Sequence, residues 1–270
     1  MSLRIQSNVE AFNAHRQLEG TSGKLSKAME RLSSGYRINR AADDAAGLAI
    51  SEKLTAQVGG LDQAQRNAQD AVSLVQTAEG AMNEVHSMLQ RVRDLAVQFN
   101  NGTLSTSDKA AITAEVAQLC NEIDRIAGQT KFNNIALLSG GATITFQIGA
   151  GDGETITVTA AKLFGGSTAD IDSAIFNFSG SVTLASIDAA IDNVSKTRST
   201  FGSVQNRLEH TLNNLATYEE NLSASKSQIK DVDMASEMVN FTKLQILQSA
   251  GTSMLAQANS SPQSVLKLLG

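Results

Sequence analysis

The strongest constraint on the fold of this chain is a long run of regularly spaced apolar residues. Between residues 61 and 99, alternating steps of three and four residues always reach an apolar side chain. These positions are Leu61, Ala64, Ala68, Ala71, Val75, Ala78, Met82, Val85, Leu89, Val92, Ala96 and Phe99. A heptad pattern of this length predicts a helix that packs along one seam against other helices. At ~1.5 Å per residue such a helix spans roughly 60 Å, which favours an elongated bundle over a compact one.

Two further apolar seams predict the partners of this helix. The second seam comprises Ile112, Val116, Leu119, Ile123 and Ile126. The third comprises Leu184, Ile187, Ile191, Val194, Phe201, Val204, Leu208, Leu212, Leu215 and Leu222. Turn residues at 100–103 separate the first two helices. Ser107 or Asp108 can cap the second helix, and Gly128 can end it. Together the seams predict one coiled-coil-like helical bundle.

The composition suits helices that meet along narrow seams. Only 4% of the 270 residues are aromatic and tryptophan is absent, whereas large rings normally fill the gaps of a thick core. The single proline, Pro262, lies near the end, so no proline interrupts a helix in residues 1–261. We therefore expect a mainly α-helical protein.

A different period appears in the middle of the chain. Ile144, Phe146 and Ile148 alternate with polar residues, and after the glycine-rich stretch 149–153 the residues Ile156 and Val158 do the same. Alternation on both sides of a glycine-rich loop predicts a β-hairpin. We expect a small β region at about 140–182, in which the Gly- and Ser-rich part from 160 onwards has a less regular pattern.

The two ends of the chain carry apolar helical patterns that have no evident partner in the bundle. The first end repeats a leucine every seven residues, at Leu18, Leu25 and Leu32, with Met29 between the last two. Near the other end, apolar residues cover more than one helix face, at Val232, Ala235, Met238, Val239, Phe241, Ile246, Leu247, Met254 and Leu255. The last residues are apolar as well, at Val265, Leu266, Leu268 and Leu269. Because chain ends are usually polar and frayed, we expect these helices to pair with each other and with other copies of the chain.

Residues 33–60 differ from the segments on either side. Ser33, Ser34 and Gly35 can end the first helix, and Gly59 and Gly60 precede the long seam. The residues between them mix charges with small side chains. We expect an extended connector with a short helix.

Composition and spacing argue against several classes of function. The net charge of −5 gives no basic field for nucleic acid, and no apolar run reaches the length of a membrane span. The start of the chain lacks the apolar core of a cleavable secretory signal. His15, His86 and His210 are isolated and lack metal-ligand spacing. Cys120 lies in an apolar helical pattern, which predicts a buried, inert thiol.

Two weaker patterns have structural interpretations. Adjacent residues point in different directions on a helix, so Asp43 and Asp44 do not form a catalytic pair, and the nearby Arg37 and Arg40 favour a salt-bridge network. The glycine-rich stretch 149–153 precedes a strand rather than a helix, which favours a hairpin turn over a phosphate-binding loop. We expect no catalytic residue, cofactor or metal.

Eight collinear segments of the chain closely resemble bacterial flagellin. They are MERLSSGYRINRAADDAAGLAISEKL (29–54), QTAEGAM (76–82), LQRVRDLAVQ (89–98), NEIDRIAGQTKFNNIALLSG (121–140), FQIGAGDGETI (146–156), RLEHTLNNL (207–215), IKDVDMASE (229–237) and MLAQANSSPQSVLKLLG (254–270). The chain lacks the long variable insert that many flagellins carry near residues 160–182, so it resembles a minimal flagellin. One departure is Asn134, which stands where the family usually has glycine.

The resemblance implies an architecture and a function. Residues 1–42 and 231–270 would form the paired inner helices that line the filament channel, 43–60 the connecting spoke, and 61–230 the bundle of the filament wall. The chain would be a structural subunit, not an enzyme, that self-assembles into the extracellular helical filament used for motility. The resemblance implies export by the flagellar type III system. The implied partners are other flagellin subunits, an export chaperone, the filament cap and hook-associated junction proteins.

The resemblance also implies a contact patch. The segment LQRVRDLAVQ together with Glu115 resembles the patch that a host's Toll-like receptor 5 recognises and that also makes filament contacts. Arg91, Leu95 and Glu115 match it. Since Arg91 and Leu95 are four residues apart, we expect a charge beside an apolar anchor on one helix face.

Two alternatives remain open from the residues. A hook–filament junction protein shares both terminal patterns, and homopolymerisation in vitro discriminates between the two. A secreted enzyme, as in flagellins with catalytic inserts, would need a metal or nucleophile constellation in residues 140–182, and we find none there.

Overall fold

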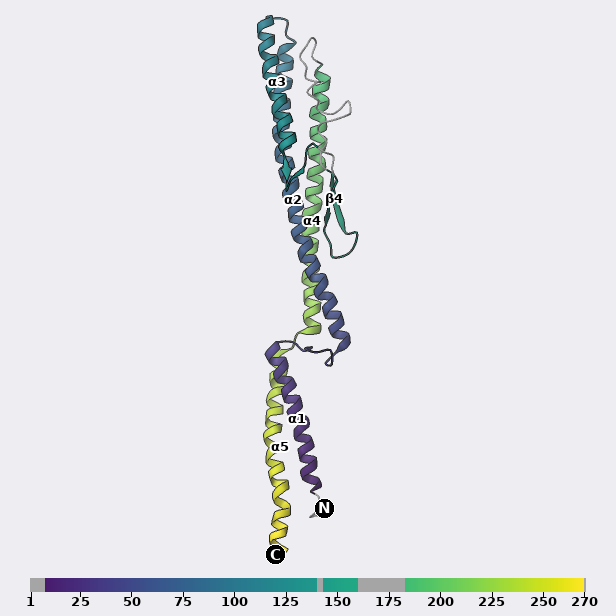
Figure 1. Ribbon diagram of the computed structural model, residues 1–270, viewed down its shortest axis with the longest axis vertical. Coiled ribbons are helices and arrows are strands. Elements are labelled where there is room, and N and C mark those ends of the chain that lie inside the picture. Colours follow the sequence, from purple (N-terminus) through teal and green to yellow (C-terminus); the bar gives the residue numbers. More distant parts are fainter. Residues whose placement is uncertain (1–7, 140–142, 160–182, 270) are drawn as a thin grey trace. The chain divides into compact units, whose positions relative to one another are not determined.

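The computed structural model describes residues 8–139, 143–159 and 183–269, with side chains described up to residue 260 (Figure 1). In chain order the elements are α1 (Val9–Ser34), α2 (Ala45–Phe99), α3 (Thr106–Gln129), β1 (Lys131–Phe132), β2 (Ile135–Ala136), β3 (Thr143–Gln147), β4 (Thr155–Thr159), α4 (Leu184–Lys230) and α5 (Met234–Leu269). The expected fold class, mainly helical with a small central β region, is confirmed. The chain divides into a terminal unit, residues 1–56 and 221–270, and a bundle unit, residues 57–220.

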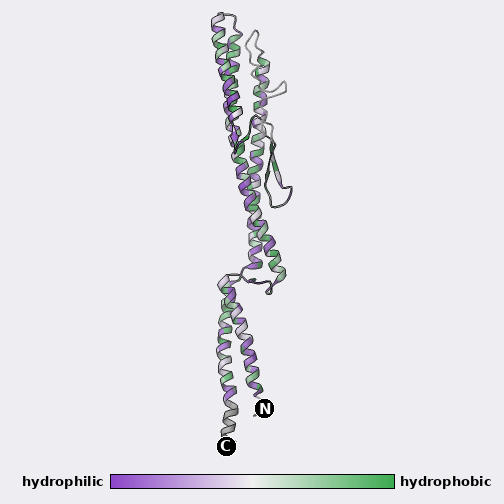
Figure 2. Ribbon diagram, in the orientation of Figure 1, coloured by the Kyte–Doolittle hydropathy of each residue, from purple (hydrophilic) through white to green (hydrophobic). Residues whose placement is uncertain are grey.

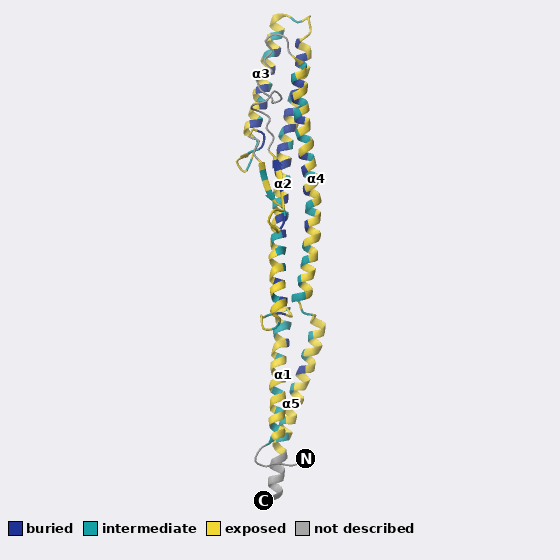
Figure 3. Ribbon diagram, turned by 90° about the vertical axis from the view of Figure 1, so that its right-hand side faces the viewer, coloured by how far each residue is buried: buried dark blue, intermediate teal, exposed yellow. Residues whose placement is uncertain are grey.

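The bundle unit is built around the long seam of α2. Every predicted seam position from Leu61 to Phe99 is buried, with at most 7% of its surface exposed. Ion pairs show how the neighbouring helices run: Arg93 of α2 meets Asp188 near the start of α4, and Glu79 meets Arg198 further along α4. α2 and α4 are therefore antiparallel. In Figure 3 the buried residues gather on α2, α3 and α4.

The other two seams complete this core. On α3, Ile112, Val116 and Ile123 are buried. On α4 the buried seam residues are Ile187, Val194, Phe201, Val204, Leu208 and Leu215. The remaining positions of the two seams are half-buried. The predicted three-seam bundle is confirmed, because all three apolar stripes contribute to its core.

The predicted ends of α3 need correction. Its cap is Ser105, not Ser107 or Asp108: the Ser105 hydroxyl accepts the N–H of Asp108, and the Asp108 carboxylate accepts the N–H of Ser105 in return. Hydrogen bonds from Ser105 also hold the pKa of Asp108 below its ordinary value. The helix continues past Gly128 to Gln129. A reciprocal capping box satisfies two backbone donors at once, which explains why the helix starts there.

The predicted β-hairpin is present with the expected alternation. β3 pairs antiparallel with β4, with Ile144 opposite Val158 and Phe146 opposite Ile156. Ile156 and Val158 are buried in the bundle core. The loop between the strands lies against α2, since a Cβ added at Gly60 would be 3.0 Å from the Cβ of Ala150. The hairpin is therefore a part of the bundle unit.

A second, shorter hairpin was not predicted. β1 and β2 pair through Phe132 and Ile135, with Asn133 and Asn134 forming the turn between them. Both asparagines have left-handed backbone angles, φ 45° and 65°. Asparagine tolerates this conformation better than most residues. Asn134 can therefore occupy a position where glycine is usual, and the Asn-Asn pair was the signal in the sequence.

The connector is shorter than the sequence suggested. α1 ends at Ser34 with Gly35 in a left-handed cap, as predicted, but α2 already begins at Ala45. Asp44 precedes α2, and its carboxylate accepts the N–H of Gly47. Gly59 and Gly60 lie inside α2 and do not break it. The expected extended connector over 33–60 is therefore wrong for most of its length.

Candidate assembly surface

The terminal unit consists mainly of an antiparallel pair of helices, α1 and α5. The side chain of Asn8, which caps α1, donates to the carbonyl oxygen of Ala258, 2.7 Å away. At the other end of the pair Arg31 lies 3.9 Å from Glu237. Between them a Cβ added at Gly251 would be 3.2 Å from Leu18. The expected pairing of the two chain ends is therefore present.

The contact between α1 and α5 is narrow. On α1 the less exposed positions follow three- and four-residue steps, at Ala11, Ala14, Leu18, Thr21, Leu25, Ala28 and Leu32. The corresponding positions on α5 are Phe241, Leu244, Gln248, Gly251, Leu255 and Ala258. Of these seam positions on α1 and α5, Ala28 and Leu244 are buried and the others are half-buried. Leu18, Leu25 and Leu32 thus lie on the seam but stay half-buried, because each helix covers one face of the other.

Most apolar side chains outside this seam are exposed. They are Val9, Phe12, Met29, Tyr36, Ile50, Met234, Met238, Val239, Ile246, Leu247 and Met254. We call these residues the assembly surface. Apolar residues recur along α5 in Figure 2, whereas Figure 3 draws α1 and α5 as largely exposed. Met238, Val239, Thr242, Lys243 and Ile246 line a shallow hollow of about 410 Å³ on α5.

The short segment between α1 and α2 is hydrogen-bonded to the end of α4 and to the residues between α4 and α5. Val232 donates its N–H to the carbonyl of Gly35, and Arg37 donates its N–H to the carbonyl of Lys230. The Arg37 guanidinium also donates to the carbonyl of Ile229, at 2.7 Å. These hydrogen bonds join residues that are almost 200 positions apart in sequence. The segment is therefore held by the terminal unit itself and does not depend on a partner.

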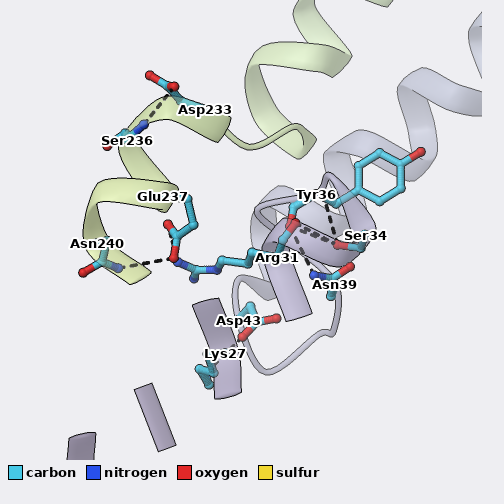
Figure 4. Close-up of polar contacts among 10 residues, drawn as sticks. All are labelled: Lys27, Arg31, Ser34, Tyr36, Asn39, Asp43, Asp233, Ser236, Glu237 and Asn240. Carbon is cyan, nitrogen blue, oxygen red and sulfur yellow. Dashed lines mark hydrogen bonds and ion pairs between the residues drawn. The ribbon is translucent and has the colours of Figure 1, made fainter. Parts of the chain in front are cut away.

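Two charged residues of this segment, Arg40 and Asp43, form ion pairs, but not with the expected partners (Figure 4). Asp43 accepts a hydrogen bond from Lys27 at 3.1 Å and another from the N–H of Arg40. The Arg40 side chain pairs with Glu30 instead, at 2.9 Å. The hydrogen bond from Lys27, followed by the one from Arg40, lowers the pKa of Asp43. The expected salt bridges of Arg37 and Arg40 with Asp43 and Asp44 are therefore wrong, because Lys27 and Glu30 of α1 supply the side-chain partners of Asp43 and Arg40.

The predicted contact patch is only partly at the surface. Arg91 and Glu115 are exposed and form an ion pair of 2.7 Å between α2 and α3. Leu95, in contrast, is only 2% exposed and belongs to the bundle core. The expectation that Leu95 stands beside Arg91 as an exposed anchor is therefore wrong for the isolated subunit. The flanking helices bury a wider stripe of α2 than the seam positions alone.

The other residues weighed in the sequence have structural roles. Cys120 is buried, as predicted, and burial raises the pKa of its thiol to about 11, which disfavours the reactive thiolate. The described residues hold no group of three or more His, Cys, Asp and Glu side chains placed to bind a metal ion. Within the described helices, no segment combines the length and hydropathy of a membrane span. The side chains of Val265, Leu266, Leu268 and Leu269 lie outside the described residues.

A helix pair that exposes most of its apolar residues, next to a fully packed bundle, is typical of a structural protein that assembles with copies of itself. The comparisons with known proteins agree. Residues 5–143 match the bacterial flagellin N-terminal helical region, and residues 184–269 match the bacterial flagellin C-terminal helical region. The chain belongs to the bacterial flagellin family. It is a structural subunit of the extracellular flagellar filament, and not an enzyme.

The similarity to individual relatives covers nearly the whole chain. The chain is 51% identical to a flagellin of Halalkalibacterium halodurans, over 98% of this chain and 99% of the relative. It is 45% identical to a flagellin of Bacillus subtilis, over 99% of this chain and all of the relative. The crystal structure of Bacillus cereus flagellin matches 60% of this chain and 94% of its own length, with a TM-score of 0.50 and 36% identity. A structure described as a putative flagellar hook-associated protein from Vibrio parahaemolyticus shares the fold, with a TM-score of 0.61 over 70% of this chain and all of its own, at 15% identity.

Proposed function

We propose that this flagellin joins the filament through the assembly surface of its terminal unit. In this proposal residues 1–42 and 231–270 form the inner layer of the filament and residues 61–230 the wall. Residues 43–60, most of which are the first turns of α2, lead from one layer to the other. The observation that carries it is the large number of exposed apolar side chains on α1 and α5. A monomeric protein rarely leaves so many apolar residues uncovered on one pair of helices.

The physical driving force is burial of this apolar surface. Each Å² of apolar surface removed from water contributes about 25 cal/mol, and ordering of the helices subtracts from that gain. An isolated α1–α5 pair covers only one face of each helix, so further faces remain for neighbouring subunits. Contacts between different faces of identical subunits generate an open helical polymer when the rotation from one subunit to the next does not close a ring.

The experiment is seeded polymerisation of the full chain with a charge placed on the assembly surface. Val239 is 72% exposed, so Val239→Asp is expected to leave the thermal melt of the monomer unchanged. Burying an unpaired carboxylate in an assembled contact is costly, so the variant should not form filaments. The matched control is Ser249→Asp, which adds the same charge at an exposed polar position of the same helix. Normal filaments from Val239→Asp would contradict the proposal.

We further propose that the apolar face of α5 binds the export chaperone before the subunit leaves the cell by type III export. Amphipathic helices commonly bind in apolar grooves of partner proteins, where a few apolar side chains act as anchors. On α5, Met238, Val239 and Ile246 are side chains of this kind. From their apolar character in the sequence, Val265, Leu266, Leu268 and Leu269 are proposed to take part in the same binding. Ile246→Asp should weaken chaperone binding in a titration, whereas Ser249→Asp should not. Equal affinity of both variants would contradict this role.

For the ends of the filament we propose contacts with hook-associated junction proteins and with the filament cap. The likeness in fold to a putative hook-associated protein supports the idea that the junction proteins use similar helices. The rival assignment, in which this chain itself is a junction protein, predicts no homopolymer. Electron microscopy of the purified chain after seeding therefore separates the two assignments, because long filaments exclude the rival.

We also propose that the exposed pair Arg91 and Glu115 contributes to subunit contacts and, in a host, to recognition by Toll-like receptor 5. The pair is solvent-accessible, and its charges are available to a partner. Arg91→Ala should weaken the response of a receptor reporter to the monomer. Arg125→Ala removes another exposed, ion-paired arginine and serves as the control. Since Leu95 is buried, its substitution would act through the core and is a poor test.

A further inference from the structure

The methionines are distributed unevenly between the two units. Met29, Met234, Met238 and Met254 of the terminal unit are all 48–65% exposed. In the bundle unit Met82 is fully buried and Met88 half-buried. Met238 also lines the hollow on α5 together with Val239 and Ile246. Thus four thioethers of the described residues are accessible to solvent, and each lies on the assembly surface that filament contacts would cover.

We propose that these four methionines are redox-sensitive modification sites, at which two-electron oxidants such as peroxides control whether a free subunit can join the filament. The inference rests on the proposed assembly through the terminal unit. Accessibility decides where a methionine is oxidised, so the free subunit is the vulnerable form. Once the surface is covered by neighbours, the same sulfur atoms are shielded.

The chemistry is a simple oxygen transfer. A lone pair of the methionine sulfur attacks one oxygen of hydrogen peroxide, and the O–O bond breaks. A sulfur–oxygen bond forms, and the proton carried by the transferred oxygen goes to the departing hydroxide, which leaves as water. The sulfur loses two electrons, and the peroxide gains them. Each event adds one oxygen, about 16 Da, and a sulfoxide reductase can reverse it.

The modification changes a contact that is otherwise apolar. A thioether is soft and polarizable and fits apolar contacts, whereas a sulfoxide is polar and needs a hydrogen-bond donor when it is buried. Around Met238 the donors are few. The hydroxyl of Thr242 is already donated to the backbone carbonyl of Met238, at 2.9 Å, and Lys243 supplies the charged donor of this hollow. Lys243 is thus the remaining donor among the residues that line the hollow, and a sulfoxide at Met238 would enter a subunit contact unsatisfied unless the Lys243 ammonium reaches it.

The experiment compares treated and untreated full-length protein. Monomer is exposed to hydrogen peroxide, the excess is removed with catalase, and peptide mass spectrometry follows each methionine. Met29, Met234, Met238 and Met254 should be oxidised before Met82 and Met88. The critical concentration for seeded growth should then rise by on the order of tenfold, as expected for burial of a polar group without a partner. Treatment with methionine sulfoxide reductase should restore growth, and the same methionines in finished filaments should react more slowly.

Two variants separate this effect from general oxidative damage. The variant M29L/M234L/M238L/M254L replaces the accessible thioethers with an apolar side chain of similar size that peroxide does not oxidise. Its ratio of treated to untreated critical concentration should be close to one, whatever its own starting value. Met82→Leu, in the bundle core, should keep the full sensitivity of the unmodified chain. If the quadruple variant does not polymerise untreated, Met238→Leu and Met254→Leu are used singly, and each should reduce the sensitivity.

The proposal is overturned if fully oxidised monomer grows as well as untreated monomer. It is also overturned if the leucine variants lose growth after peroxide as strongly as the unmodified chain. Failure of the underlying assembly proposal would look different, because Val239→Asp would then form normal filaments without any oxidant.

Discussion

The terminal unit and the bundle unit have the same heptad spacing of apolar residues, but they bury these residues to different extents. In the bundle unit the α2 seam is buried throughout, because α3, α4 and the β3–β4 hairpin together cover it. In the terminal unit α1 has α5 as its helical neighbour, and the leucines of its seam remain half-buried. Outside the seams, the described large apolar residues left exposed by the bundle unit are Val97, Ile135 and Tyr218. The number of neighbouring helices, and not the apolar spacing, decides whether a seam completes a core.

The largest expected difference concerns independent folding and assembly. A fragment of residues 57–220 contains the packed core and should melt cooperatively as a helical monomer, because its apolar seams are covered within the unit. It should not form filaments at any concentration tested, since it lacks α1 and α5. Circular dichroism and electron microscopy of seeded samples check both statements. Filaments from this fragment would contradict the assignment of assembly to the terminal unit, because assembly would then need neither α1 nor α5.

Truncation of one leucine in each unit should affect different measurements. Leu89→Ala removes a fully buried side chain and should lower the free energy of unfolding of the bundle by about 2–5 kcal/mol. Leu244→Ala, on α5, should leave the bundle's denaturation midpoint in place and weaken seeded growth. Urea denaturation and sedimentation of the two variants give the answer. A large shift of the bundle midpoint in Leu244→Ala would show that the units do not unfold separately.

Adjacent glycines of α2 offer a smaller and closely matched test. A Cβ at Gly59 meets open space, so Gly59→Ala should stabilise the bundle by roughly 0.5–1 kcal/mol through better helix propensity. A Cβ at Gly60 would lie 3.0 Å from the Cβ of Ala150, so Gly60→Ala should gain less or lose stability. Thermal melts of the two variants compare a free position with a packed one. Equal gains would mean that the hairpin loop does not rest on α2.

The smallest expected effect concerns pH and the terminal unit. The pKa of Asp43 is lowered by the hydrogen bond from Lys27, so its ionised form stabilises the folded segment above its ordinary pKa. This contribution is lost as the pH falls below about 4 and through the lowered value, when the folded carboxylate is protonated. The protection factors of residues 35–44 against hydrogen exchange should therefore fall in that range. In Asp43→Asn the acid-induced change should be smaller, whereas an unchanged profile would exclude Asp43 as its source.

Much of the fold could be predicted because it depends on local spacing. The α2 seam, the pairing of β3 with β4 and the end of α1 at Gly35 follow from apolar periods and from backbone conformations that few residues adopt. The turn at Asn133 and Asn134 was also present in the sequence, but asparagine pairs are a weaker signal than a glycine. The cap at Ser105 was missed because Ser107 and Asp108 offered similar chemistry within three residues.

Which apolar face is covered depends on the packing of the elements and could not be predicted from the sequence. The sequence places Leu95 four residues after Arg91, a spacing that suits a surface anchor as well as a core residue. The structure buries Leu95 because α2 packs against more than one helix, so its buried stripe is wider than the seam. The reverse holds for Met238 and Val239, whose apolar character is plain in the sequence, while their exposure is not. A residue type determines how strongly a side chain avoids water, but only the arrangement of neighbouring elements determines whether this chain covers it or leaves it to another copy.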